Sequence, residues 1–247
     1  MSLVLSLFPG IGLLDRAFEL EGFCVVRGPD LLWGGDVRTF APPADKFDGI
    51  IGGPPCQEFS PLAAIARARG YRVRPNVIPE FERLIAATRP RWFVMENVRR
   101  APLPTVGGYV VRAYLLNNLW FGGIQHRVRR ISFGTRDGLT LPLEADALMP
   151  SDQRTALLTR GARRWMDRKS ADTTRPRRVC AYETLSIAES LERQGLPPNF
   201  FEHSPLTLDG KKRALGNGVP LPLGRAVARA VKQALTGEQD VLSEGIA

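Results

Sequence analysis

The chain has 247 residues, enough for one ordinary domain or for a large domain with a small one, which excludes a multi-module assembly. Apolar residues make up 44% and charged residues 24%, as in ordinary globular proteins, so a largely disordered chain is a poor fit. Lys and Arg number 34 against 25 Asp and Glu, a formal net charge of +9. Such a basic excess is typical of proteins that bind a polyanion, most often nucleic acid, although a solvated basic surface explains it equally well.

The three cysteines, Cys24, Cys56 and Cys180, have no paired spacing and no histidine cluster near them. They therefore predict neither a disulfide framework nor a zinc site, and we expect reduced thiols inside a cell and no bound metal. The apolar run near residue 1 is too short for a signal peptide or a membrane span. We accordingly expect no membrane partner.

Short apolar runs alternate with helical patterns over the first hundred residues. Strands are predicted at Leu3–Phe8, Phe23–Val26, Lys46–Ile51 and Arg91–Met95, and helices at Leu13–Glu21 and Glu80–Thr88. This alternation predicts an α/β fold with a mostly parallel sheet and helices on both faces. Such sheets place their binding sites at the carboxyl ends of the strands.

The pattern weakens from Thr135 to about Pro176, which we interpret as a small appended region. Within it, Asp152–Trp165 shows helical spacing. Regular apolar spacing returns at Leu221–Leu235, where the sequence predicts a final helix introduced by Gly216-Asn217-Gly218-Val219-Pro220.

A glycine turn, Gly10-Ile11-Gly12, follows the first predicted strand, and glycine lets a backbone approach a ligand closely. A dinucleotide fingerprint needs a third glycine at position 15, which is Asp, so a nicotinamide site loses support. After the second strand, Asp30 and Asp36 can accept hydrogen bonds from a ribose and an adenine amine. Loop carboxylates in water are the alternative.

Cys56 follows a predicted strand and a double proline, which holds it at the edge of the sheet. A thiolate is a strong nucleophile, so this placement suits covalent catalysis, although a lone cysteine is more often a packing residue. Glu96 ends another predicted strand and lies close to Cys56 if the two strands are neighbours. A partly buried carboxyl group there can stay protonated and act as an acid, whereas its alternative is a surface glutamate.

Residues 125–129 alternate with the period of a strand, so Gln125, Arg127 and Arg129 are predicted to face one way. Two guanidinium groups on one face can clamp a phosphate or a base edge. An ordinary basic sheet face is the alternative.

Taken in order, these motifs resemble those of the cytosine-C5 DNA methyltransferases. The resemblance extends from residue 3 to about residue 231 and rests on Phe8–Gly12, Pro54–Gln57, Glu96–Val98, Gln125–Arg129 and Gly216–Pro220. It implies a Rossmann-like fold that depends on S-adenosylmethionine. It also implies a catalytic and cofactor-binding domain at 1–134 and 208–247 and a small target-recognition region at 135–207.

The resemblance implies a mechanism as well. Cys56 adds to C6 of a cytosine flipped out of duplex DNA, and Glu96 bonds N3 and the amino group of that base. Arg127 and Arg129 steady the flipped base and its backbone. C5 takes the methyl group, and the cofactor leaves as S-adenosylhomocysteine.

The resemblance assigns two further groups of residues by position. The cofactor contacts are Phe8, Gly10, Ile11, Gly12, Asp30, Asp36, Val37, Pro55, Asn217 and Val219. The DNA contacts are Gln57, Ser60, Arg67, Arg69 and Gln125. Residues 59–79, rich in arginine, match the loop that closes on DNA in this family.

Three departures from the family pattern bear on the cofactor site. Asp30 and Asp36 are unusually close in sequence, so a helix normally found between them is missing and the Asp30 assignment is open. Ser6 stands where an acidic residue is common, and Leu13 replaces the last glycine of the first motif. We expect both to loosen cofactor contacts without removing a reacting group.

The leading hypothesis is a DNA (cytosine-5-)-methyltransferase acting as a monomer in the bacterial cytoplasm, of the restriction-modification type or encoded by a phage or mobile element. One alternative is methylation of transfer RNA, although the Cys-Phe-Thr signature of that branch has only Cys180-Ala181-Tyr182 as an analogue here. The other is a DNA-binding homologue with weakened catalysis.

Overall fold

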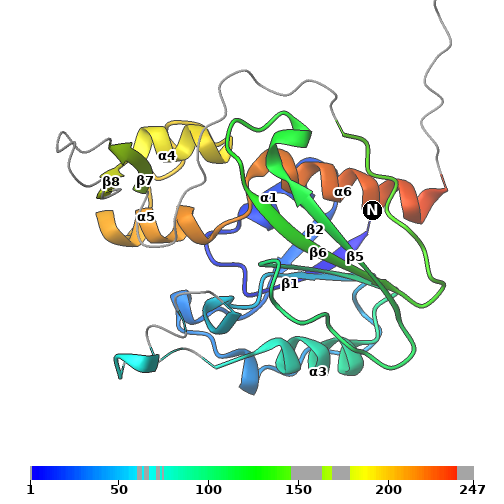
Figure 1. Cartoon of the computed structure of the whole chain (residues 1–247). Coiled ribbons are helices and arrows are strands. Elements are labelled where there is room, and N and C mark those ends of the chain that lie inside the picture. Colours follow the sequence, from blue (N-terminus) through cyan, green and yellow to red (C-terminus); the bar gives the residue numbers. More distant parts are fainter. Residues whose placement is uncertain are drawn as a thin grey trace, which may run out of the picture.

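The computed structural model describes residues 2–59, 63, 67–70, 73, 75–145, 163–168 and 179–237, with the strands at 163–168 and 179–184 described by their backbone. One main sheet dominates this part of the chain, and helices lie against both of its faces (Figure 1).

The main sheet has six strands in the order β2-β1-β3-β4-β6-β5. They are β1 (Leu3–Leu7), β2 (Cys24–Arg27), β3 (Gly49–Gly52), β4 (Trp92–Asn97), β5 (Val110–Asn117) and β6 (Val128–Thr135). The pairs from β2 to β4 are parallel, and β6 runs antiparallel to both of its neighbours. The prediction of a mostly parallel sheet is confirmed.

Helices α1 (Leu13–Leu20) and α6 (Leu221–Thr236) cover one face of the sheet, and α3 (Ile78–Thr88) covers the other (Figure 1). On the first face, Phe18 and Leu223 pack with Trp92 in one buried apolar cluster. On the second, Phe81 and Phe93 belong to another. Strands β1, β3 and β4 therefore alternate their side chains between two cores, which fixes their register.

Two shorter helices, α4 (Ile187–Gln194) and α5 (Leu208–Asn217), pack together near the carboxyl ends of the parallel strands (Figure 1). A third apolar cluster joins Leu191 and Leu215 to Leu13 at the start of α1. Ser186 caps α4 through a reciprocal capping box with Glu189. The late sequence is thereby fixed beside the first turn of the chain.

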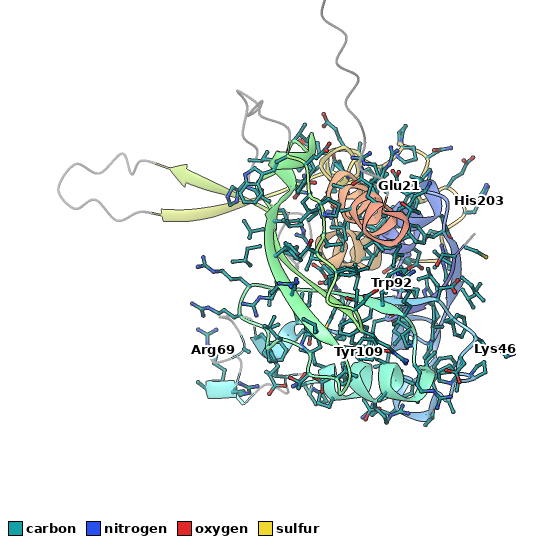
Figure 2. All side chains as sticks on the ribbon, turned by 90° about the vertical axis from the view of Figure 1, so that its right-hand side faces the viewer. Glu21, Lys46, Arg69, Trp92, Tyr109 and His203 are labelled. Atoms are coloured by element: carbon teal, nitrogen blue, oxygen red, sulfur yellow. The ribbon has the colours of Figure 1, made fainter. Side chains whose placement is uncertain are left out.

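A separate antiparallel hairpin is formed by β7 (Arg163–Arg168) and β8 (Val179–Thr184). It projects from the main body in Figure 2. Residue 165 lies in β7, so the predicted helix Asp152–Trp165 is wrong at its end, while its residues 152–162 lie outside the described part. Pairing with β8 favours a strand at residues 163–168, although the local apolar spacing favours a helix.

Candidate active site

A left-handed backbone segment connects β1 to α1. Phe8, Gly10 and Gly12 have φ angles of 56°, 57° and 76°, and the N–H of Gly12 donates to the carbonyl of Pro9 at 2.8 Å. Glycine adopts such angles freely, but Phe8 does so at a conformational cost. The predicted glycine turn therefore exists, and it exposes backbone at the end of β1.

Cys56 lies just beyond β3, in the segment that leads into the short 3-10 helix η3 (Gln57–Phe59). Because β3 pairs with β4 in parallel, the ends of these strands carry Cys56 and Glu96 to the same edge of the sheet. The amide of Asn97 donates to the carbonyl of Pro54 at 3.2 Å and so fastens the proline segment to β4. A Cβ built on Gly53 would lie 3.4 Å from Oε2 of Glu96, which places that carboxylate against the same segment.

Glu96 is 7% exposed, and its Oε1 lies 2.8 Å from Nε of Arg129. Burial raises the pKa of the Glu96 carboxyl group, while the positive charges of Arg129 and Arg127 oppose that rise. The site therefore holds a carboxyl group that retains a proton to higher pH than an ordinary glutamate does.

The Cys56 thiol is partly buried and is not in a disulfide. Burial raises its pKa, the negative charge of Glu96 raises it further, and Arg129 and Arg127 lower it. The resting side chain is accordingly a thiol. A nucleophilic thiolate forms only where positive charge nearby outweighs burial.

Arg127 is 2% exposed, and its Nη2 donates to the carbonyls of Gly216 at 2.8 Å and Gly218 at 2.9 Å. Burial lowers the pKa of this guanidinium group to about 9. The structure thus brings Arg129 to the carboxylate of Glu96 but turns Arg127 toward the protein interior. Their joint role as a clamp on a base or phosphate stays a prediction, and in this structure the carbonyls of Gly216 and Gly218 hold Arg127.

Gln125 is completely buried, and its side-chain amide donates to the carbonyl of Arg193 at 2.6 Å. This contact fastens the segment before β6 to α4. The predicted contact of Gln125 with DNA stays a prediction, and in this structure the side chain is buried against α4.

A cavity of about 500 Å³ opens at the carboxyl ends of β1, β3 and β4. Cys56, Glu96 and Arg129 line it together with the glycine turn and residues of α5. Asn217 and Val219, far away in sequence, lie in its wall. The structure thereby brings the predicted reacting groups and the last predicted cofactor motif to one cavity.

A second cavity, of about 300 Å³, shares part of its wall with the first. The shared residues are Phe8, Asp30, Leu31 and Pro55. Asp36 and Val37 line the second cavity alone. Ten residues predicted to hold the cofactor thus lie along this pair of cavities or in the turn that borders them, with Gly12 in the turn.

Asp30 occupies the boundary between the two cavities. Its carboxylate accepts from the N–H of Gly10 at 2.8 Å and from that of Leu32 at 2.7 Å. Between β2 and β3 the chain forms only two 3-10 helices, η1 (Leu31–Trp33) and η2 (Val37–Thr39), so the predicted absence of an α-helix there is confirmed. The short connection still places Asp30 beside the glycine turn.

Asp36 caps η2 by accepting from the N–H and the Nε of Arg38, both at 3.0 Å. These hydrogen bonds lower the pKa of the Asp36 carboxyl group. Asp36 is therefore ionised at neutral pH and faces an apolar cavity wall, an arrangement suited to accepting a hydrogen bond from an amine.

The family model for C-5 cytosine-specific DNA methylase matches residues 34–161, which is more than half of the chain. The chain belongs to the C5 cytosine methyltransferase family. Among curated relatives, the type II methyltransferase M1.HphI of Haemophilus parahaemolyticus is 38% identical over 112 residues, covering 39% of this chain but only 30% of the relative. The type II methyltransferase M.FnuDI of Fusobacterium nucleatum is 24% identical over 98% of this chain and 97% of its own length.

Solved structures show the same fold. The Entamoeba histolytica methyltransferase EhMeth superposes with a TM-score of 0.66 at 12% identity, covering 95% of this chain and 99% of the other. A putative DNA modification methyltransferase encoded within an Escherichia coli prophage gives 0.63 at 17% identity, covering 96% and 100%. The predicted S-adenosylmethionine-dependent methyltransferase fold is confirmed.

The two departures in the first motif of this methyltransferase have structural partners. The hydroxyl of Ser6 donates to Oδ1 of Asp15 at 2.5 Å, and Oδ2 of that buried carboxylate lies 3.1 Å from Nε of Arg27. Both Ser6 and Asp15 line the larger cavity, so a carboxylate is present in its wall although Ser6 itself is neutral. Asp15 was not predicted from the sequence as a residue of the site. The signal that could have indicated it is an acidic residue in the first turn of α1.

Leu13 packs into the apolar cluster formed with α4 and α5. A Cβ added to Gly218 would lie 2.3 Å from Cδ1 of Leu13, so the leucine fills space that the glycine leaves open. The substitution in the first motif is thereby matched to a residue of the last motif.

The remaining predicted DNA contacts lie after Cys56. Gln57 lines the larger cavity. Arg67 is exposed and pairs with Glu58 at 3.1 Å, and Arg69 is exposed and well separated from Glu21 (Figure 2). Ser60 lies outside the described residues.

Among the described residues, no group of three or more His, Cys, Asp and Glu is arranged to hold a metal ion. None of the helices in the same ranges is long and apolar enough to cross a membrane.

Proposed function

We propose that this methyltransferase transfers a methyl group from S-adenosylmethionine to C5 of cytosine in double-stranded DNA, through a covalent bond between Cys56 and C6. The observation that carries the proposal is the larger cavity, in whose wall Cys56, Glu96 and Arg129 lie with the glycine turn and Asn217. A nucleophile, an acid and a cofactor wall around one cavity are the parts that this transfer needs.

The residues of the cavity have complementary tasks. The Cys56 thiol gives up its proton to solvent water and its sulfur forms a bond to C6, while the electron pair of the C5–C6 double bond moves toward C5 and N3. The protonated Glu96 donates its proton to N3, which neutralises the charge that develops on the ring. Arg129 holds the Glu96 carboxyl group at 2.8 Å and lowers the pKa of the thiol.

The cycle closes when C5 has been substituted. C5 loses its proton to solvent water, the electron pair of that bond restores the C5–C6 double bond, and the Cys56–C6 bond breaks to release the thiolate. N3 returns its proton to Glu96, and the thiolate takes a proton back from water, so both side chains recover their starting states and one proton is released in each cycle. Without the proton from Glu96, attack would leave a negative charge on the ring in a site of low polarity.

The two adjoining cavities fit S-adenosylmethionine in chemistry. Phe8 and Val37 offer apolar surface, and Asp36 an acceptor, to an adenine at the smaller cavity. Asp30 lies at the boundary, where a ribose would be held, and Asn217 at the far wall. When bound, the cofactor supplies the methyl group and leaves as S-adenosylhomocysteine.

DNA is the favoured substrate because arginines follow Cys56 in sequence, at Arg67 and Arg69, and because curated relatives carry type II methyltransferase names. The target base must leave the duplex stack to reach Cys56, since that residue is partly buried. We further propose residues 135–207 as the target-recognition region, a monomeric state, and action in bacterial cytoplasm. Relatives from bacteria and from Bacillus phages accord with that setting.

The proposal is tested by transfer of tritium from labelled S-adenosylmethionine to duplex DNA of varied sequence, with the wild-type chain and with Cys56→Ser. We expect transfer with the wild type and none with Cys56→Ser, because a serine hydroxyl is a far weaker nucleophile. Cys24→Ser is the matched control, since Cys24 is exposed on β2 and should leave activity unchanged.

Three outcomes would contradict the proposal. Transfer to transfer RNA but to no duplex DNA would establish the RNA-methylating alternative. DNA binding without transfer, and without a trapped adduct on duplexes that carry 5-fluorocytosine, would establish a binding protein. Residual transfer by Cys56→Ser would place the nucleophile elsewhere.

A further inference from the structure

The backbone around Asn217 is held by side chains from two other elements. Nη2 of Arg127 donates to the carbonyls of Gly216 and Gly218, which flank Asn217 on either side. The side-chain amide of Gln194, at the end of α4, donates to the carbonyl of Leu215 and, at 3.4 Å, to that of Gly218. Three carbonyls at or just after the end of α5, those of Leu215, Gly216 and Gly218, therefore accept from donors far away in sequence.

These contacts supply hydrogen-bond donors to carbonyls that have no partner within α5. The last carbonyls of a helix have no partner within the helix, and here the chain turns after Asn217 toward α6. Gly216 is buried, so its carbonyl depends on a protein donor. Asn217 by contrast is exposed and lines the larger cavity. The anchored carbonyls thus fix the direction in which the Asn217 side chain points.

We infer that Arg127 is a positioning residue that acts on the cofactor through Asn217, rather than a clamp on the flipped base. This inference rests on the proposed function and assigns the two arginines of the strand different tasks. Arg129 lines the cavity and pairs with Glu96. Arg127 is 2% exposed, and its Nη2 donates to the carbonyls of Gly216 and Gly218.

The position of Arg127 also links the two binding sites. Its charge affects the pKa of both Glu96 and Cys56, so the guanidinium group lies near the reacting groups as well as near the cofactor wall. Gln125, two residues earlier, ties the same segment to the carbonyl of Arg193 on α4. The start of β6, the end of α4 and the end of α5 are consequently one connected unit.

The inference is tested by a double-mutant cycle on the binding of S-adenosylhomocysteine to the full chain, measured by calorimetry. Arg127→Lys keeps the positive charge but cannot place one planar group between two carbonyls. We expect it to weaken binding about tenfold, the size of effect that a lost hydrogen bond to a charged group produces. In an Asn217→Ala background the same substitution should have little effect, because the side chain on which it acts is absent.

Two further variants keep the test independent of folding defects. Gln194→Met removes the donor from α4 to the carbonyls of Leu215 and Gly218, and we expect it to show the same dependence on Asn217. Arg129→Lys is the matched control, which should keep affinity for S-adenosylhomocysteine within about twofold while slowing covalent trapping on 5-fluorocytosine DNA. Thermal unfolding of every variant reports whether it is folded.

Steady-state kinetics separate positioning from clamping. Arg127→Lys should raise the KM for S-adenosylmethionine and recover most of its kcat at saturating cofactor. Additive effects of Arg127→Lys and Asn217→Ala, or a kcat that stays low at saturation with unchanged affinity, would overturn the inference while leaving the proposed function in place. A wild-type chain that binds no S-adenosylhomocysteine would overturn both.

Discussion

The proposed chemistry needs a Cys56 thiol that can lose its proton and a Glu96 carboxyl group that can keep one, and both groups line the same cavity. Burial raises the pKa of both groups, which favours the protonated form of the carboxyl group but also disfavours the thiolate. The negative charge of an ionised Glu96 adds to the cost of forming the thiolate. Arg129 moderates this conflict, because its charge lowers both pKa values from a distance of 2.8 Å to the carboxylate. The proposed chemistry depends on this balance more than on any one group.

Glu96→Gln should lower the pKa of the Cys56 thiol, because the substitution removes a negative charge that disfavours the thiolate. The midpoint of the pH dependence of alkylation by iodoacetamide is expected to move to lower pH, and mass spectrometry of peptides distinguishes Cys56 from the other cysteines. Adduct formation with DNA should nevertheless slow by about 10²- to 10⁴-fold, since glutamine cannot give a proton to N3. Glu80→Gln on α3 is the control, and an unchanged or raised midpoint in Glu96→Gln would contradict the assignment.

Some residues of the site could be predicted from the sequence and others could not, for a physical reason. Cys56, Glu96 and the glycine turn follow strands directly, so their place at one edge of the sheet follows from strand order. The partners of Arg127 lie 89 and 91 residues further along the chain, and no local spacing shows them. The hydrogen bond from Ser6 to Asp15 crosses from β1 to α1 and was equally invisible.

Among the elements, strand β4 contributes to both cores and to the site. Its six residues are all buried, and its first two are aromatic. Trp92 pairs with Gly49 on β3, and Phe93 pairs with Gly134 on β6. A Cβ on either glycine would lie 2.2 Å from the opposing ring, so each ring covers the glycine of the next strand. This packing fixes the position of β4 relative to its neighbouring strands, and with it the position of Glu96.

Gly134→Ala should destabilise the fold by about 1–3 kcal/mol, because the added methyl group would overlap the ring of Phe93 in a core that cannot yield. Gly107→Ala is the matched control, since a Cβ there meets nothing within 4 Å, and a change within about 0.5 kcal/mol is expected. Denaturant unfolding of the two variants measures the difference. Equal stability of Gly134→Ala and the wild type would show that the strands can separate to admit the methyl group.

Elements with a strong period and clear boundaries were predicted correctly, and weakly patterned ones were not. The helices α3 and α6 were expected to within two residues of their observed ends, because each buries one apolar face. Strand β5 was missed, since it lies at the sheet edge with most of its residues partly or fully exposed and so lacks a clear alternation. The hairpin of β7 and β8 was missed because each strand is defined by its partner.

At the scale of the whole molecule, the question is where the positive charge behind the net charge of +9 lies relative to the site. Arg67 and Arg69 follow Cys56 in sequence, and Arg129 lies in the cavity itself. On α6, Arg225 and Arg229 are paired with Glu21 at 2.7 and 3.7 Å. Figure 2 shows Arg69 well separated from Glu21. Arg69 therefore lies in a different part of the surface from the arginines that pair with Glu21.

Removing one charge from each of these two parts of the surface should accordingly have unequal effects on DNA binding. Arg69→Ala is expected to reduce the slope of log Kd against log salt concentration by about 0.9, the value for one lost phosphate contact. Arg225→Ala removes the same charge from α6, where the arginine pairs with Glu21 at 2.7 Å, and should leave the slope unchanged. Fluorescence anisotropy of a labelled duplex at several salt concentrations measures both slopes. Equal losses would mean that the net charge acts on DNA from all sides, and that the loop after Cys56 makes no phosphate contact of its own.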